Sequence, residues 1–169
     1  MQQHDSHSKF WSGDVGPFFM NRSFVPRQQE GPHCVSTVLS MLTGQAPEVI
    51  RPGINTQDPV SCSDYLRGRG MKLAFCPTDC RRLRHYLDDL LALDDLFTLS
   101  YYSPTDAEAI CADPNEKGWV CGSHIVLLHR DQILDPASGT RTAALAHHGM
   151  NRFTKRILRL VPSNHAWGL

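Results

Sequence analysis

Three side chains in this sequence could together activate a thiol for attack on a carbonyl carbon. Cys34 opens an apolar helical segment, His124 opens the segment HIVLLH, and Asp135 ends the segment DQILD. A thiol is a good nucleophile only as the thiolate, and a helix N-terminus together with an imidazolium lowers the pKa of a cysteine. Histidine acts as base and acid in such pairs, and a carboxylate on its other nitrogen fixes its orientation. The combination predicts nucleophilic cysteine chemistry.

Each of these residues has an ordinary explanation when it is taken alone. Free cysteine is among the most buried residue types, so Cys34 alone would be a core residue. His124 alone would be a hydrogen-bonded strand histidine, and Asp135 before a proline would be a turn residue. The prediction of a site therefore depends on the three occurring together, in order and on suitable elements.

A second histidine, His129, competes with His124. It lies five positions further along the same expected strand and therefore on the opposite face. Small residues precede His124 and leave it accessible, whereas His129 adjoins the charged turn at 130–131. With the hairpin centred on that turn, position 124 pairs near position 137, which makes Asp135 a diagonal neighbour of His124. We therefore expect His124 to be the active histidine.

The apolar pattern predicts the elements that position these side chains. Helical spacing and stop signals predict helices over residues 34–43, 61–69 and 79–93, and 141–148 is compatible with a further short helix. Strand-like patterns cover residues 71–76, 96–102, 119–129, 132–134 and 153–161. An irregular surface loop is expected over 103–118. Helices followed by strands predict an α+β fold with N-terminal helices packed on a C-terminal antiparallel sheet.

In these features the chain resembles the papain-like cysteine peptidases, and among them the bacteriocin-processing, double-glycine type and its bacterial relatives. The resemblance rests on Gln28 in QQEGPHC, on the helix CVSTVLSMLTG, on GSH opening a strand, and on LDPASG. It implies a papain-like fold in which Gln28 donates a hydrogen bond into the oxyanion hole. Cys34 and His124 would form the thiolate–imidazolium pair, and Asp135 would orient the imidazole.

Two positions depart from the pattern of that family. Gln29 adjoins Gln28 and would be the oxyanion donor if the loop were one residue shorter. His33, directly before the cysteine, is not a position that the chemistry of the family requires. The resemblance carries over the fold and the acyl-transfer mechanism, and it leaves the substrate open.

The function expected from the resemblance is that of an acyl-transfer enzyme. The simplest form is a cysteine peptidase that hydrolyses a peptide or isopeptide bond of a peptide or protein through a thioester on Cys34. The same machinery acting on a glutamine side chain would make a glutamine deamidase or a transglutaminase-like effector. A nonenzymatic binding module that keeps the fold is the alternative from another class.

Two groups of residues raise the alternative of a metal site. Cys76 and Cys80, with His85 near them, suggest zinc, but structural zinc sites normally need two close pairs and no second pair is present. Three further histidines suggest a metal, although a solvated helix face is the more ordinary explanation: His147, His148 and His165. No glycine-rich phosphate loop occurs. We expect neither a metal nor a cofactor.

The composition indicates an ordinary globular protein. The 169 residues carry 17 basic and 17 acidic side chains and are 41% hydrophobic, which is typical of a globular chain. A single domain over 13–169 is expected after a flexible lead-in at 1–12. Zero net charge argues against nucleic-acid binding by bulk charge, and no apolar run approaches the roughly 20 residues of a membrane helix.

The N-terminal segment lacks the pattern of a signal peptide. We therefore expect a cytoplasmic protein with six reduced cysteines, or an effector exported by a signal-independent route.

Zero net charge also hides an uneven distribution of charge along the chain. Residues 85–116 carry eight acidic and no basic side chains, whereas 136–169 carry five basic and no acidic ones. Two such faces can simply attract each other within the fold. Because the acidic run includes the loop that leads to His124, we expect part of it to border the site and to favour a basic or neutral substrate segment.

Overall fold

The computed structural model describes residue 11 and residues 16–111 and 113–169. Its helices and strands are α1 (Cys34–Thr43), α2 (Pro47–Ile50), α3 (Pro59–Arg67), β1 (Met71–Cys76), α4 (Arg84–Leu93), β2 (Leu96–Tyr102), β3 (Ser123–His129), β4 (Gln132–Asp135), β5 (Thr140–Ala143) and β6 (Thr154–Pro162). The predicted lead-in at 1–12 lies outside the described residues except for Trp11, whose side chain is buried.

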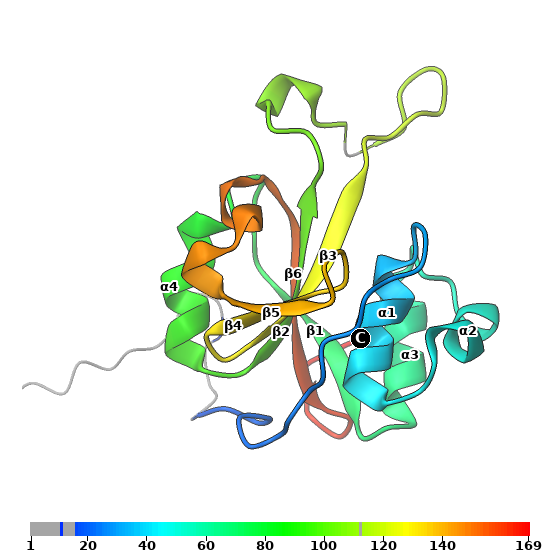
Figure 1. Ribbon diagram of the computed structural model, residues 1–169, viewed down its shortest axis with the longest axis vertical. Coiled ribbons are helices and arrows are strands. Elements are labelled where there is room, and N and C mark those ends of the chain that lie inside the picture. The colour runs from blue at the N-terminus through cyan, green and yellow to red at the C-terminus, as the bar shows by residue number, and fades with distance from the viewer. Residues whose placement is uncertain (1–10, 12–15, 112) are drawn as a thin grey trace, which may run out of the picture.

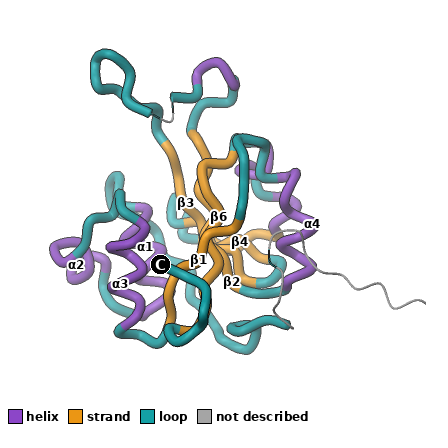
Figure 2. Tube along the Cα trace, turned by 180° about the vertical axis from the view of Figure 1, so that it is seen from behind, coloured by secondary structure: helices purple, strands orange, loops and turns teal. Residues whose placement is uncertain are grey.

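One six-stranded sheet forms the centre of the fold, in the order β1-β6-β2-β3-β4-β5. Every neighbouring pair of strands is antiparallel. The strand β6 comes last along the chain but lies between β1 and β2, so it joins two parts of the sheet. Helices α1 to α3 lie on one side of the sheet and α4 lies on the other (Figures 1 and 2). The predicted α+β class is confirmed.

The sheet separates two hydrophobic cores, because side chains alternate between the faces of a strand. In β3, Val126 and Leu128 belong to the core beneath α4, while Leu127 belongs to the core beneath α1 and α3. Covering both faces explains why β2 is buried along its whole length.

The helix α1 occupies the predicted segment and carries the candidate nucleophile at its first residue. All its residues from Ser36 to Leu42 are buried. It ends at Gly44, which has a left-handed φ of 79° and donates its backbone N–H to the Ser40 carbonyl at 2.8 Å. No side chain caps the N-terminus at His33. The backbone N–H of Cys34, at the start of α1, therefore keeps its donor capacity for a ligand.

The predicted helix at 79–93 begins later than expected, at Arg84. Residues 81–83 pair with the start of β6 and the residues before it. The Leu83 N–H donates to the Arg152 carbonyl at 3.0 Å, and the Thr154 N–H donates to the Arg81 carbonyl at 2.7 Å. Pairing with a distant segment thus overrides the local helical pattern at this end.

The short helix considered over 141–148 is wrong. Residues 140–143 instead form β5, which pairs with β4, because Ile133 and Leu134 of β4 are buried and need a neighbour for their backbone. Two short 3₁₀ turns follow, at Ala144–Ala146 and His148–Asn151. These turns carry the chain back over the end of the sheet.

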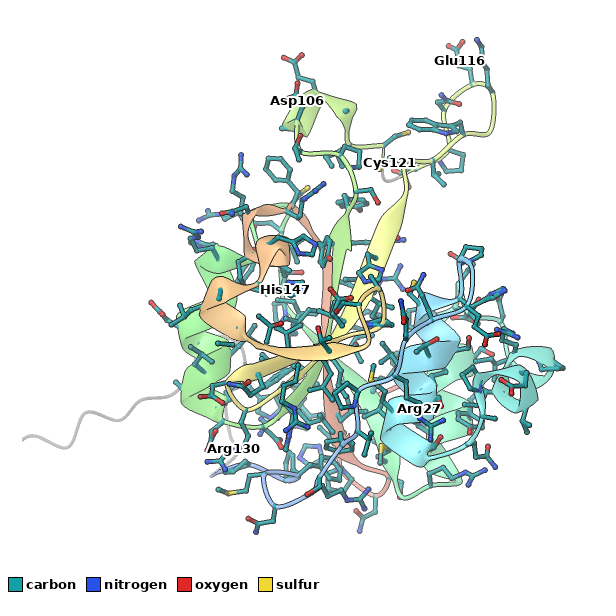
Figure 3. The ribbon with its side chains drawn as sticks, in the orientation of Figure 1. Arg27, Asp106, Glu116, Cys121, Arg130 and His147 are labelled. Carbon is teal, nitrogen blue, oxygen red and sulfur yellow. The ribbon has the colours of Figure 1, made fainter. Side chains whose placement is uncertain are left out.

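Residues 103–122 connect β2 to β3 and project away from the body of the molecule (Figure 1). Figure 3 shows Asp106 and Glu116 at the far end of this projection. The predicted surface loop over 103–118 is confirmed, and only one 3₁₀ turn, at Ala107–Ala109, interrupts it in its described part.

A buried ion pair ties the chain that precedes α1 to the sheet. Arg159 of β6 donates from Nε and Nη2 to Oδ2 of Asp95, at 3.1 and 3.0 Å, and both side chains are fully buried. The carboxylate of Asp95 also accepts the backbone N–H of Phe18 at 3.0 Å and of Phe19 at 2.8 Å. Segment 18–19 is thereby held against the sheet.

Within the described residues, no helix combines the length and the apolar character needed to cross a bilayer.

Candidate active site

The structure brings Cys34 and His124 together where α1 begins and β3 begins. The two side chains share a hydrogen bond, which lowers the pKa of the thiol and raises that of the imidazole. The backbone N–H groups of Ile125 and Val35 also hydrogen-bond the sulfur. The thiol is therefore surrounded by donors, the arrangement that stabilises a thiolate.

His124 also binds the carboxylate of Asp135. Its Nε2 donates to Oδ1 at 2.8 Å, and the two side chains are 17% and 6% exposed. The hairpin register explains the contact: Leu127 faces Leu134 across β3 and β4, so position 124 lies opposite 137, as the sequence predicted. Because Nε2 is engaged by Asp135, Nδ1 is the nitrogen that remains for Cys34.

The charges of the three groups support one another. Burial alone would raise the pKa of Cys34, but hydrogen bonding and attraction to His124 offset it and leave the pKa below the ordinary 9.0. Burial alone would lower the pKa of His124, yet the hydrogen bonds to Asp135 and Cys34 raise it to about 9. Burial alone would raise the pKa of Asp135, but the hydrogen bonds that it accepts from His124 and His147 hold this pKa well below 3.8. The shifts of all three groups thus favour the thiolate–imidazolium pair.

The other oxygen of Asp135 has its own partner, which sequence reasoning missed. His147 lies in the segment after β5 (Figure 3), and its Nε2 is 2.8 Å from Oδ2 of Asp135. The backbone N–H of Gly149 donates to Nδ1 of His147 at 3.0 Å. Since Nδ1 accepts, Nε2 carries the proton and donates it to Asp135. The ordinary explanation as a solvated helix face is wrong for His147, which is only 6% exposed.

One set of potential metal ligands occurs within the described part of the chain: atoms of Asp135, His147 and His148 lie within 4.8 Å of one another. Both ring nitrogens of His147 are already used, one by Gly149 and one by Asp135. A metal ion would have to replace the hydrogen bond that holds the carboxylate. We therefore interpret the cluster as a hydrogen-bonded support for Asp135.

Tyr101 covers this cluster from β2. Its ring meets that of His124 edge-on, with centroids 5.6 Å apart, and contacts the rings of His147 and His148 at 6.4 and 6.2 Å. The close packing requires a glycine at position 149, because an added Cβ there would lie 2.7 Å from the Tyr101 ring and 2.9 Å from Nδ1 of His147. The side chain of Tyr101 is 4% exposed, so it keeps water away from the hydrogen bonds of Asp135.

The structure does not bring the side chains of Gln28 and Gln29 into the cavity beside Cys34. Gln28 is exposed. Gln29 is half-buried, with Nε2 donating to the Gly31 carbonyl at 2.8 Å, and its Oε1 is buried with no hydrogen-bond partner among the described residues.

The loop that contains Gln28 and Gln29 nevertheless forms a backbone hydrogen bond to the turn that follows Asp135. The backbone N–H of Gln29 donates to the Pro136 carbonyl at 2.7 Å. Gly139, with a φ of +67°, packs so closely that an added Cβ would lie 2.8 Å from Cβ of Gln28. The glycine of LDPASG is therefore required twice, by its left-handed backbone and by this close approach.

A cavity of about 160 Å³ opens beside Cys34, between α1, α3 and the sheet. Its wall combines apolar and polar side chains, with Val38, Leu39 and Leu73 among the apolar members. Its only lysine and arginine are Lys155 and Arg156, and none of the described acidic side chains lines it. The expectation that acidic residues of 85–116 border the site is wrong: none of them lines the cavity, and Asp106 and Glu116 lie at the far end of the projecting loop (Figure 3).

The remaining histidine and cysteine candidates lie in other environments. Nε2 of His129 is 3.3 Å from the Phe19 carbonyl, and its ring packs edge-on against Phe24. All six cysteines are free. Burial raises the pKa of Cys62 to about 11 and that of Cys76 to about 12, so neither forms a thiolate at neutral pH. Cys80 is exposed.

Comparison with known proteins finds no family model, no curated protein and no solved structure that matches the chain.

Proposed function

We propose that the chain is a cysteine-dependent acyl-transfer enzyme that hydrolyses peptide or isopeptide bonds. The observation that carries the proposal is the continuous hydrogen-bonded series from Cys34 through His124 to Asp135. Supporting it, nucleophile, base and orienting carboxylate come from three separate elements and lie side by side, with His124 2.8 Å from Asp135. The α+β architecture, with the cysteine opening a helix and the histidine opening a strand, supports a papain-like arrangement.

In the first step the thiolate of Cys34 attacks the carbonyl carbon of the substrate, forming a C–S bond. His124, as imidazolium, donates the proton on its Nδ1 to the nitrogen of the scissile bond. The C–N bond then breaks and the amine leaves, while the acyl group stays on the sulfur as a thioester. Asp135 remains ionised and keeps the ring turned toward the sulfur.

In the second step water resolves the thioester. Neutral His124 accepts a proton from the water as its oxygen attacks the acyl carbon. The C–S bond breaks, the acyl group leaves as a carboxylic acid, and the thiolate–imidazolium pair is restored. Proton transfer of this kind contributes about 10²–10⁴-fold to the rate.

The oxyanion that forms in both steps needs hydrogen-bond donors. The backbone N–H of Cys34 is one of the uncapped donors at the start of α1. The second donor is proposed to be the side chain of Gln28, with Gln29 as the alternative from the same loop. A single oxyanion donor contributes about 3 kcal/mol to lowering the barrier.

Mass spectrometry of a mixed peptide and protein library, incubated with wild-type protein or with Cys34→Ala, tests the proposal. The wild type is expected to create new peptide termini that are absent with Cys34→Ala. A Cys80→Ala variant, which removes an exposed cysteine, is the matched control and is expected to act like the wild type. Undiminished cleavage by Cys34→Ala would refute the proposal. A mass change on glutamine without new termini would instead identify a deamidase.

A further inference from the structure

Two basic side chains enter the cavity beside Cys34 from consecutive positions of β6. Consecutive residues of a regular strand point to opposite faces of the sheet. Here the pairing with β2 is irregular: Ser100 faces Arg156 while Tyr101 faces Thr154, so Lys155 is an extra residue in β6. This bulge lets both Lys155 and Arg156 line the same cavity. Bulges of this kind redirect side chains beside functional sites.

Neither of these two cations has an acidic partner among the residues that the structure describes. Lys155 donates to the hydroxyl of Ser123 at 3.2 Å, and within the described residues no carboxylate forms an ion pair with either cation. Both side chains are half-buried. Burial and the adjacent positive charge of Arg156 lower the pKa of Lys155. Cys34 and His124 together carry no net charge as an ion pair, and Asp135 behind His124 adds one negative charge, so Lys155 and Arg156 leave one net positive charge around the cavity.

The wall of the cavity also holds a hydroxyl without a partner. Thr98 of β2 is 3% exposed and lines the cavity, and its Oγ1 is buried with no hydrogen-bond partner among the described residues. Ser100, on the same face two residues further along β2, is 8% exposed and also lines the cavity. Buried polar groups are normally hydrogen-bonded, so the hydroxyl of Thr98 is an unsatisfied polar group just behind the cavity wall.

We propose that this cavity is a carboxylate-binding subsite, which selects substrates that carry an acidic side chain on a residue adjacent to the attacked carbonyl. The proposal rests on the proposed function for its place beside the nucleophile. The guanidinium of Arg156 offers the planar pair of donors that suits a carboxylate, and Lys155 adds a second positive charge. The apolar part of the wall, which includes Val38, Leu39 and Leu73, suits the methylene groups of the side chain.

The size of the cavity suits a side chain of this kind. Its volume of about 160 Å³ is close to the ~150 Å³ of a cavity that holds a benzene-sized group. A lysine or arginine of the substrate would instead meet two like charges in a half-buried site, which disfavours it. The basic or neutral preference expected from the acidic run along the chain is thereby replaced by an acidic one.

Binding without turnover tests the subsite separately from the chemistry. In the Cys34→Ala background, fluorescence anisotropy would measure the affinity of labelled peptides that differ only in one glutamate, glutamine or lysine on either side of the scissile bond. We expect the glutamate peptide to bind about tenfold more tightly than the glutamine peptide, the size of one charged hydrogen bond. Adding Arg156→Gln should abolish this ratio, whereas Arg69→Gln, an exposed arginine outside the cavity, should preserve it.

The outcomes separate the two proposals. Equal binding of glutamate and glutamine peptides, absence of binding to both, or a ratio that survives Arg156→Gln would overturn the subsite. If wild-type protein cleaves peptides without such a preference, the proposed function stands and the subsite falls. If the ratio appears in Cys34→Ala but wild-type protein cleaves no peptide, the subsite stands and the proposed function falls. If circular dichroism shows that Arg156→Gln is unfolded, Lys155→Gln replaces it and is likewise expected to abolish the ratio of the two affinities.

Discussion

Asp135 binds His147 and His124 through different oxygens. His147 donates to Oδ2 and His124 to Oδ1, each at 2.8 Å, and the backbone N–H of Ala137 adds a third donor to Oδ1 at 2.9 Å. A carboxylate with donors on both oxygens cannot rotate without breaking one of them. We infer that His147 is a positioning residue that keeps Asp135 directed at the active histidine.

Replacing His147 by phenylalanine is expected to lower kcat by roughly 10- to 100-fold, the effect of leaving a buried acceptor unpaired. KM should change little, because His147 does not line the cavity. The alkaline limb of the pH–rate profile should move from about 9 toward the ordinary 6.5 of histidine, because Asp135 is no longer held against His124.

Conservative replacement distinguishes positioning from folding. His147→Gln places an amide N–H where Nε2 stood and is expected to restore most of the lost kcat. His148→Phe, at the exposed neighbour, is the control and should leave the profile in place. A His147→Phe protein with an unchanged alkaline limb would show that the contact does not position Asp135.

The pH dependence of activity follows from the two shifted groups. The active ion pair exists above the lowered pKa of Cys34 and below the raised pKa of His124, about 9. Activity should therefore rise as the pH passes the lowered pKa of Cys34 and fall as the pH passes about 9. Initial rates across pH, with a neutral peptide, measure both limbs.

Alkylation of Cys34 measures, without a substrate, the ionisation that produces the acidic limb of the pH–rate profile. At pH 6, iodoacetamide should modify Cys34 faster than an ordinary thiol. Cys62 and Cys76, with pKa values raised to about 11 and 12, should stay unmodified in the folded protein. Mass mapping of the modified cysteine identifies the site, and uniform slow labelling at pH 6 would contradict an activated thiol.

The oxyanion donor can be assigned with two single variants. Gln28→Ala is expected to lower kcat by about 10²–10³-fold with little effect on the free energy of unfolding. Gln29→Ala should mainly loosen the loop, since its side chain bonds within the loop. The opposite ranking of the two kcat values would make Gln29 the donor, and two unaffected variants would remove both glutamines from the mechanism.

The stability of the fold should depend on the buried pair of Asp95 and Arg159. Asp95→Asn removes the charge that compensates a fully buried arginine, and it is expected to lower the free energy of unfolding by about 3–5 kcal/mol. Asp94→Asn, at the exposed pair with Arg130, should cost less than ~1 kcal/mol. Urea denaturation of the two variants gives the comparison, and equal midpoints would contradict it.

Local patterns predicted much of the fold and the central three residues of the site. The strands at 71–76 and 96–102 occur at the predicted positions, because long apolar runs with clear breakers leave few alternatives. Counting along the hairpin also placed Asp135 beside His124, because the turn length determines the register.

The position of His147 and the bulge at Lys155 depend on contacts between segments far apart in the sequence, which local patterns do not predict. His147 contacts Asp135 only because β5 replaces the short helix considered there and two 3₁₀ turns carry the chain back over the sheet. The bulge at Lys155 arises from the match between β6 and β2, and no residue type marks it in advance. The count of charge along the chain placed the acidic run beside the site, but Asp88 and Asp89 lie on α4, across the sheet from α1, and Asp106 and Glu116 lie at the far end of the projecting loop.

The position of β6 in the sheet means that the reactivity of the Cys34 thiol depends on complete folding. The strand is made after every catalytic element, yet it fills the gap between β1 and β2 and carries two residues of the cavity. A nascent or partly unfolded chain already contains the cysteine but has no continuous sheet to hold α1 against β3. We therefore expect Cys34 to react as an ordinary thiol until the last strand is inserted, so that its alkylation rate at low pH reports the completed fold.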